Sequence, residues 1–413
     1  MVSSATSVPR LSLSREAVED LAAERREPEW LRQIRRQAFE AFERMPLPDQ
    51  HTEGWRRTSL RGLPLEAAAE PGTGVADQTL ADMAGARLAS VRGGAVTTEG
   101  GEVMDLRDAL GDPRLAERVQ QHLARIVQPE MDKFTALHYA LFDAGVLVYL
   151  PRGRAVEQPL WITHVDSLRP HTLIILDEGA EARVVEEFTA SGALASGAVE
   201  QVLGPNAKLR YVNVQRFPTE TWSFTTQRAI LAQDAHLRTL NAALGARTAR
   251  NTIQVVLEGR GSQADLLGVV AIGDRQHVDF QTLQDHFGNA TRSDLIIHDA
   301  LRDRASANFT GLIRINKTAR QTESSQEQKN ILLSDRARAD SDPKLEILNN
   351  DVIRCTHGAA VGPVDQEMLF YLQSRGLDRA WAEQLIVEGF FRSTLEKLGD
   401  ERIQEALWAA ISA

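Results

Sequence analysis

Short apolar runs separated by turn residues dominate the middle of the chain. From residue 146 to about residue 348, runs of three to five apolar residues are separated by glycine, asparagine, aspartate and proline. No segment of useful length there follows the period of an amphipathic helix. The pattern therefore predicts a long succession of short β-strands. Representative apolar runs lie at 146–150, 173–176, 253–257, 266–270, 295–297 and 331–333.

A longer repeat underlies these strands. Its most regular copies place Ala180, Ala207, Ala235 and Ser262 at equivalent positions, with steps of 27, 28 and 27 residues. A unit of this size cannot bury its inward face alone, so the copies must stack and share one core. The repeat favours a β-solenoid over the alternative, a β-sandwich, whose turn signals recur every ~8–12 residues without a longer period. Arginines at matching places are expected to form an exposed, solvated ladder: Arg183, Arg210 and Arg238.

Helical patterns flank the strands on both sides. We expect three domains: an N-terminal helical or mixed domain (1–145), a β-solenoid core (146–362) and a C-terminal helical domain (363–413). The first ten residues are predicted to be a disordered arm, and two short strands are expected between residues 90 and 109. The C-terminal helices are expected to cap the last turn of the solenoid and to offer an apolar groove. The predicted helices span 14–44, 113–127, 131–142, 365–375, 378–398 and 401–410.

Composition narrows the classes of function. The net charge of −10 argues against a general nucleic-acid-binding protein, which normally carries a basic excess. A single cysteine excludes an internal disulfide and fits a reducing compartment. No apolar run approaches the ~18–20 residues that span a bilayer, and the N-terminus lacks the apolar core of a secretory signal. We therefore expect a cytoplasmic protein with no membrane segment.

The only cysteine has a histidine two residues after it. In a strand, Cys355 and His357 point to the same face, about 6.6 Å apart along the strand, and Thr356 points away. A thiolate and an imidazole are both metal ligands, but a tetrahedral site usually needs four donors. The pair therefore indicates a metal half-site that a partner completes. The alternative is that Cys355 is a small buried apolar residue, which is the usual role of a free cysteine.

The remaining motifs are weaker evidence for a particular function. The acidic turn with Asp335, Asp340, Ser341 and Asp342 resembles a calcium cluster of β-solenoid polysaccharide lyases, so a carbohydrate-active enzyme of the lyase type is the alternative function. A polar turn explains the same residues. The chain contains no Gly-x-x-x-x-Gly-Lys-Ser/Thr phosphate-binding loop. We therefore expect no ATPase activity by that mechanism, and energy must come through a partner.

The motif set resembles one known family, the SufB/SufD proteins of the SUF iron–sulfur cluster assembly system. The resemblance covers nearly the whole chain and is strongest from 321 to 391. The cysteine–histidine–glycine signature and the absence of further cysteines are similar to the SufD branch of that family. The matching residues include Trp30-Leu31, Phe134-Thr-Ala-Leu-His-Tyr-Ala-Leu-Phe142, Asn330-Ile-Leu-Leu-Ser334, Pro343-Lys-Leu-Glu-Ile347, Cys355-Thr-His-Gly-Ala359, Leu369-Phe-Tyr-Leu372 and Gly389-Phe390.

The resemblance implies a right-handed parallel β-helix between helical domains. It also implies a scaffold subunit, not an enzyme, in a complex with SufB and two copies of the ATPase SufC. Cys355 and His357 would lie at the SufB-facing surface and share iron or a transient iron–sulfur cluster with SufB.

The resemblance also assigns the surface that would dock SufC. It leaves open whether the isolated chain forms a homodimer through the SufB-facing surface. The family is linked to reduced flavin, but no residue motif here identifies a flavin site. Residues implied in SufC docking are Trp381, Leu385, Phe390 and Phe391.

Overall fold

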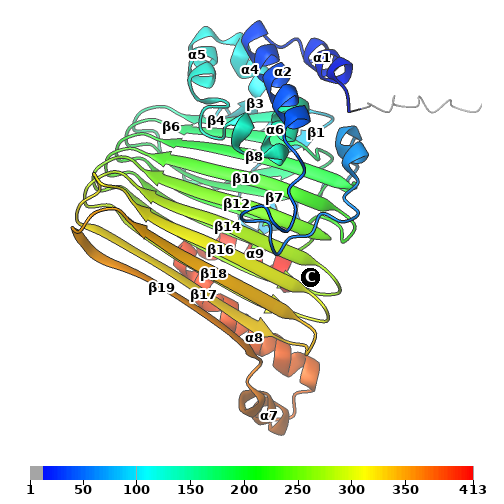
Figure 1. The fold of residues 1–413 in the computed structure, drawn as a ribbon, viewed down its shortest axis with the longest axis vertical. Helices are drawn as coiled ribbons and strands as arrows, with labels where there is room; N and C mark the ends of the chain where they lie inside the picture. Colours follow the sequence, from blue (N-terminus) through cyan, green and yellow to red (C-terminus); the bar gives the residue numbers. More distant parts are fainter. Residues whose placement is uncertain (1–12, 99, 413) are drawn as a thin grey trace, which may run out of the picture.

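The chain forms a β-solenoid with helices at both ends (Figure 1). The structure, a computed structural model, describes residues 13–98 and 100–412. Two long sheets face each other, and successive strands alternate between them, so each turn adds one strand to each sheet. About eight turns stack in this way, with parallel pairing along both sheets. The predicted fold class, a mainly β solenoid between helical segments, is confirmed.

In the part of the chain that the structure describes, the sheets contain ten and nine strands, and antiparallel pairs occur at their N-terminal ends, between β1 and β2 and between β3 and β4. The ten-stranded sheet consists of β1 (Arg87–Arg92), β2 (Ala95–Thr98), β5 (Leu160–His164), β7 (Glu181–Phe188), β9 (Lys208–Gln215), β11 (His236–Ala243), β13 (Gln263–Ile272), β15 (Arg292–Leu301), β17 (Thr322–Leu332) and β19 (Val352–Pro363). The nine-stranded sheet consists of β3 (Val103–Asp105), β4 (Ala144–Leu150), β6 (Pro170–Leu176), β8 (Leu194–Leu203), β10 (Trp222–Leu231), β12 (Thr248–Leu257), β14 (His277–His286), β16 (Ser306–Ile315) and β18 (Arg338–Ile347).

Each copy of the sequence repeat is one turn of the solenoid. The residues that follow the four repeat positions (180, 207, 235 and 262) are direct neighbours in β7, β9, β11 and β13. The residue before each repeat position has a positive φ, between 53° and 73°. Glycine adopts this conformation freely, and asparagine and aspartate tolerate it. These corner residues, which turn the chain from one sheet to the other, are Gly179, Asn206, Asp234 and Gly261.

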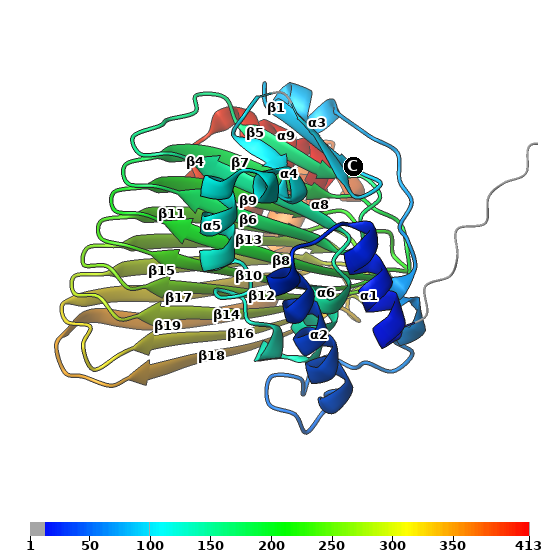
Figure 2. The same cartoon turned by 90° about the horizontal axis from the view of Figure 1, so that it is seen from above.

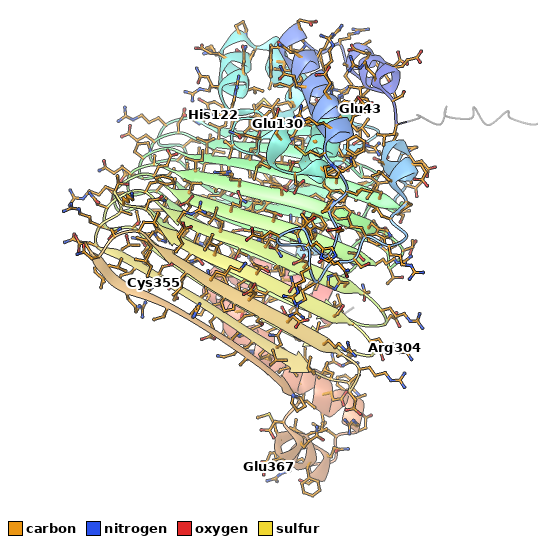
Figure 3. The ribbon with its side chains drawn as sticks, in the orientation of Figure 1. Glu43, His122, Glu130, Arg304, Cys355 and Glu367 are labelled. Atoms are coloured by element: carbon orange, nitrogen blue, oxygen red, sulfur yellow. The ribbon has the colours of Figure 1, made fainter. Side chains whose placement is uncertain are left out.

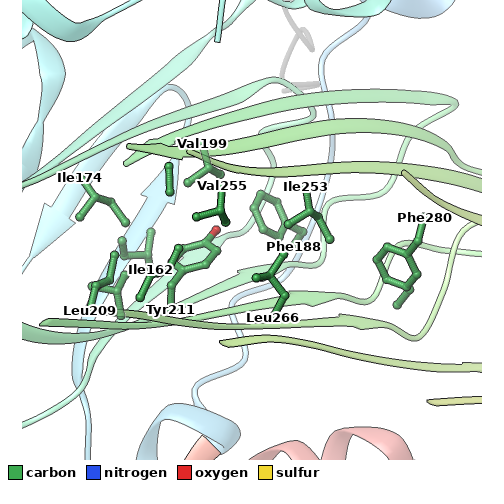
Figure 4. Packing of buried hydrophobic residues seen from close by; sticks show 14 of the residues in the cluster. Ile162, Ile174, Phe188, Val199, Leu209, Tyr211, Ile253, Val255, Leu266 and Phe280 are labelled. Carbon is green, nitrogen blue, oxygen red and sulfur yellow. The ribbon is translucent and has the colours of Figure 1, made fainter. Parts of the chain in front are cut away.

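Apolar side chains fill the lumen between the two sheets. Alternate residues of a strand point to opposite faces, so every second side chain of each strand faces the lumen. Ile162, Tyr211, Val255 and Phe280 are buried there among residues from successive turns (Figure 4). Each turn thus covers the lumen-facing apolar side chains of the turn before it. The copies are therefore stable only as a stack.

The N-terminal helices cover the outer face of the first turns, as a view from that end shows (Figure 2). The ring of Phe134 stacks on that of Phe224 in β10, with 3.6 Å between centroids. The helices predicted in this region are confirmed, whereas the predicted arm at residues 1–10 lies outside the described residues. The helical elements are α1 (Arg15–Glu24), α2 (Glu29–Arg44), η1 (Leu65–Ala69), α3 (Thr79–Met83), α4 (Leu106–Gly111), α5 (Pro113–His122), η2 (Pro129–Met131) and α6 (Lys133–Leu141).

The C-terminal helices form at the predicted positions but do not cap the last turn. They are α7 (Gln366–Ser374), α8 (Arg379–Leu395), η3 (Glu396–Leu398) and α9 (Glu401–Ser412). Phe391, Leu398 and Leu407 are buried against Trp161 and Leu240 on the outer face of the ten-stranded sheet. The expectation of capping was wrong because this outer face is itself apolar and takes up the helices. Among the described residues, no further strand pairs with the outer edge of the last turn, β18 and β19 (Figure 1).

The arginine ladder also differs from expectation. Arg183, Arg210 and Arg238 are half-buried. Arg183 Nη1 lies 2.8 Å from Asp400 Oδ2, just before α9, and Arg238 Nη2 lies 2.7 Å from Asp265 Oδ2. Two of the ladder's arginines are therefore ion-paired, and Arg183 ties the C-terminal segment to the sheet. The three-domain division stays a prediction.

Candidate metal half-site at the open end of the solenoid

The inward row of the last strand carries both candidate ligands. In β19, Cys355 is the neighbour of Ser324 and His357 is the neighbour of Gln326 in β17. Ser324 and Gln326 point into the lumen and are buried there. Cys355 and His357 lie beside them on the last strand, so their side chains face the lumen side of the open end. Figure 3 places Cys355 on this last strand, at the margin of the sheet. The structure thus brings the two residues together on one face.

The two side chains differ in their exposure. Cys355 is half-buried and packs against Ile313, Ile315 and Ala319, whereas His357 is exposed. Burial raises the pKa of the Cys355 thiol. The thiol therefore keeps its proton at neutral pH until a metal ion displaces it, because metals bind the thiolate. This arrangement offers one sulfur and one nitrogen donor.

This donor set is incomplete within the chain. Across residues 13–98 and 100–412, no three or more histidine, cysteine, aspartate or glutamate side chains gather to hold a metal ion. The acidic turn does not form a calcium cluster either, since Asp340 pairs with Arg57 and Asp342 lies 3.4 Å from Lys344. The alternative lyase function therefore loses the feature that suggested it.

The residues expected to dock the ATPase fall into two groups. Trp381 is 58% exposed and Leu385 is exposed as well. Phe391 is fully buried, and the Phe390 ring stacks on His298 at 4.4 Å between centroids. The side chain of Phe391 therefore holds α8 on the sheet and is not available for a partner, which corrects that part of the prediction. We call the exposed apolar residues of these helices the α7–α8 surface: Met368, Phe370, Tyr371, Trp381 and Leu385.

Sequence reasoning missed a polar section of the lumen. The inward row of β17 consists of buried polar side chains, and the neighbouring β15 contributes Asp299, which is 1% exposed. Burial raises the pKa of Asp299 to about 7. Buried polar side chains such as Glu186, Gln227 and Gln284 also lie on the inward rows of earlier strands, but residues 322–330 lack apolar side chains altogether, which was the signal. The inward polar residues of β17 are Ser324, Gln326, Gln328 and Asn330.

Fold and site together define the class of protein. It is a β-solenoid whose last turn is open and carries two candidate metal donors, too few for a complete site. None of the helices in the described ranges has the length and apolar character needed to cross a bilayer.

Comparisons with known proteins identify the family. A family profile described as the SufBD core domain of SUF-system FeS cluster assembly matches residues 162–390. An iron–sulfur cluster assembly SufBD family protein of Mycobacterium tuberculosis is 31% identical over 385 residues, which cover 90% of this chain and 89% of the relative. The chain therefore belongs to the SufB/SufD family of SUF-system iron–sulfur cluster assembly proteins.

The comparisons do not separate the two branches of the family. SufD of Bacillus subtilis is 27% identical over 435 residues, which cover 97% of this chain and 98% of the relative. SufB of the same organism is 26% identical over 424 residues, which cover 94% and 90%. The expected family is confirmed, and the assignment to one branch must rest on the chain's own residues.

Proposed function

We propose that this chain is a SufD-type scaffold subunit without nucleotide-binding machinery of its own, which pairs with SufB and docks the ATPase SufC. The observation that carries the proposal is the open last turn, which presents Cys355 and His357 on its inward rows. The single cysteine supports the SufD branch, since the sequence lacks the several cysteines expected of SufB. In this role the chain helps to bind iron and to build nascent clusters in the cytoplasm.

Pairing with SufB is proposed at the open end. β18 and β19 are edge strands of 10 and 12 residues, and an unpaired edge readily adds a strand from another chain. Leu345, Ile347 and Val361 are exposed there although they lie on lumen-facing rows. A partner with the same solenoid fold would cover these apolar side chains. In the absence of SufB, a second copy of this chain would use the same surface, giving a homodimer.

The proposed chemistry divides one site between two chains. Iron or a nascent cluster is the cargo and not a resident cofactor. Cys355 would supply a thiolate after losing its proton, and His357 would supply a neutral imidazole nitrogen. The remaining donors would come from SufB, because four are usual and this chain offers two.

Loss of the imidazole tests the proposal. In a complex co-expressed with SufB and SufC, His357→Ala is expected to lower bound iron and sulfide at least tenfold, since His357 is an exposed donor whose removal disturbs no packing. Anaerobic iron and sulfide analysis of the purified complex measures this loss. The control is Thr356→Ala, one residue away on the outward face, which should keep full iron and sulfide. Normal iron and sulfide in the His357→Ala complex would refute the half-site.

ATPase docking is proposed at the α7–α8 surface. Phe370 is 72% exposed, although a side chain of this size is normally buried. Phe370→Ser is expected to weaken binding of SufC about thirtyfold, as for a central interface aromatic residue. Titration of SufC against the purified chain measures the dissociation constant. Leu47→Ser, at an exposed apolar residue in the N-terminal region, serves as the control and should bind SufC normally. If the two variants bind SufC with equal affinity, SufC does not dock at this surface.

A further inference from the structure

A buried cluster of ionisable side chains joins α6 to the nine-stranded sheet. It consists of His138 on α6, His171 on β6 and Glu200 on β8, each no more than 1% exposed. His138 Nε2 lies 3.2 Å from His171 Nδ1, and His171 Nε2 lies 3.3 Å from Glu200 Oε2. Neither the half-site nor the proposed docking surfaces use these groups. Ionisable side chains are costly to bury, so the protonation states of this cluster affect the packing of α6 on the sheet.

Glu200 is held by the backbone of the segment between α5 and η2. Its carboxylate oxygens accept hydrogen bonds from the amides of Ala124, Ile126 and Val127, at 2.8–3.2 Å. The carboxylate thus faces backbone donors on one side and the His171 ring on the other. His171 is therefore the histidine that can share a charge with Glu200, and His138 lies one ring further away.

His138 makes its contacts to another imidazole, to a hydroxyl group and to aromatic rings. One hydrogen atom fits between His138 Nε2 and His171 Nδ1, so these two nitrogen atoms cannot both be protonated. On the other side of the ring, His138 Nδ1 lies 3.5 Å from Ser196 Oγ. The ring centroids of Tyr139 and Phe142 lie 5.5 and 5.9 Å from that of His138. A neutral imidazole satisfies these contacts, because it donates through one ring nitrogen and accepts through the other.

The charges around His138 oppose its protonation. The positive groups that act on it are Arg35 of α2 and Arg169, the residue before β6. The His171 ring lies between His138 and the Glu200 carboxylate, so no carboxylate of the cluster contacts His138 directly. Burial, followed by the neighbouring imidazole, lowers the pKa of His138 well below its ordinary value. His138 is therefore neutral while α6 lies on the sheet.

We propose that His138 makes the docking of α6 pH-sensitive: the helix stays on the sheet while the ring is neutral and leaves it when the ring binds a proton. On the sheet, a protonated ring would be a buried cation close to two arginines, whereas in a released helix water solvates the charge. Release of α6 would also free α2, because Arg35 donates to the carbonyl oxygens of Ala140 and Phe142 at the end of α6. The inference rests on the geometry of this chain and not on the proposed function.

The direction of the effect follows from proton binding. A histidine in a released helix has an ordinary pKa of about 6.5, whereas His138 on the sheet stays neutral below that pH. The released state therefore binds more protons, and the docked state loses stability relative to it as the pH falls below about 6.5. For one histidine, the released fraction rises about tenfold per pH unit, or about thirtyfold between pH 7.5 and pH 5.0.

Hydrogen–deuterium exchange of the full-length chain at pH 7.5 and pH 5.0, corrected for the intrinsic exchange rate, tests the proposal. Protection of the α6 amides should fall about thirtyfold at the lower pH. In His138→Gln, whose amide can still hydrogen-bond to His171 but does not titrate, it should fall less than about threefold. The matched control is His51→Gln, at an exposed histidine of the N-terminal region, which should lose protection as the unaltered chain does. The amides of β13, in the middle of the solenoid, should keep their protection.

Two outcomes would overturn the proposal. An equal loss of α6 protection in His138→Gln and in the unaltered chain would mean that other groups cause the loss. An equal loss in α6 and β13 would mean that acid unfolds the whole chain and does not release the helix. If His138→Gln fails to fold, His138→Phe gives the same test, since it keeps an aromatic ring beside Phe142 and likewise cannot titrate.

Discussion

Ile347→Asp is expected to abolish pairing with SufB while the chain stays folded. Ile347 ends β18, on the inward row that continues Ile315 of β16, and it is 45% exposed in the single chain. An aspartate there is hydrated in the isolated chain and costs little. Covered by a partner, the same carboxylate would lose its water without gaining a cation, which costs several kcal/mol. We expect at least a hundredfold weaker association.

Size-exclusion chromatography with mass detection, at several protein concentrations, measures this association. Val75→Asp is the matched control, because Val75 is an exposed valine in the N-terminal region, away from the open end. It should pair with SufB normally. If Ile347→Asp forms the complex as readily as Val75→Asp does, the open end is not the SufB interface.

Arg35→Met is expected to destabilise the chain by about 3–5 kcal/mol, the usual effect of removing one partner of a buried ion pair. Arg35 on α2 is fully buried, and its Nε and Nη2 each donate to a Glu27 carboxylate oxygen at 2.6 Å. It also donates to the carbonyl oxygens of Ala140 and Phe142 at the end of α6. Methionine fills a similar volume but takes the Arg35 donors away from the two carbonyls and from the buried Glu27 carboxylate, which keeps only the longer ion pair with Arg25 Nε at 3.4 Å.

The neighbouring residue provides the control for this prediction. Arg36 is partly exposed and pairs with Glu19 and Glu29 on the surface, so Arg36→Met should cost less than about 1 kcal/mol. The midpoint of urea denaturation, followed by circular dichroism, compares the two variants. Equal midpoints for Arg35→Met and Arg36→Met would contradict the role of Arg35 in joining α2 to α6.

The repeat could be predicted from the sequence because it depends on the local backbone conformation at each turn. Each turn needs a corner residue with positive φ, and glycine, asparagine and aspartate fill that position just before Ala180, Ala207 and Ala235. The strand pattern likewise puts Cys355 and His357 on one face, whatever lies around them. Features that depend on such short-range geometry can be predicted from a single sequence.

The surroundings of the last turn could not be predicted from the sequence in this way. An edge strand alternates in the same manner as an internal one, so the pattern of β19 does not reveal that no strand follows it. The apolar residues of α8 include exposed Trp381 and buried Phe391, and their spacing alone does not say which of them meets the sheet. Burial of Asp299 was equally hidden, since it depends on which neighbours the stacked turns bring together.

Hydrogen–deuterium exchange of the chain, as a dilute monomer and in complex with SufB, tests the central claim most directly. The claim is that the open end joins this subunit to a second family member. Within residues 13–98 and 100–412 no strand pairs with the free edges of β18 and β19, so the backbone amides there should exchange quickly in the monomer. We predict that the complex slows exchange in β18 and β19 and leaves β8 and β10 unchanged. Unchanged exchange in β18 and β19 on complex formation would contradict the account.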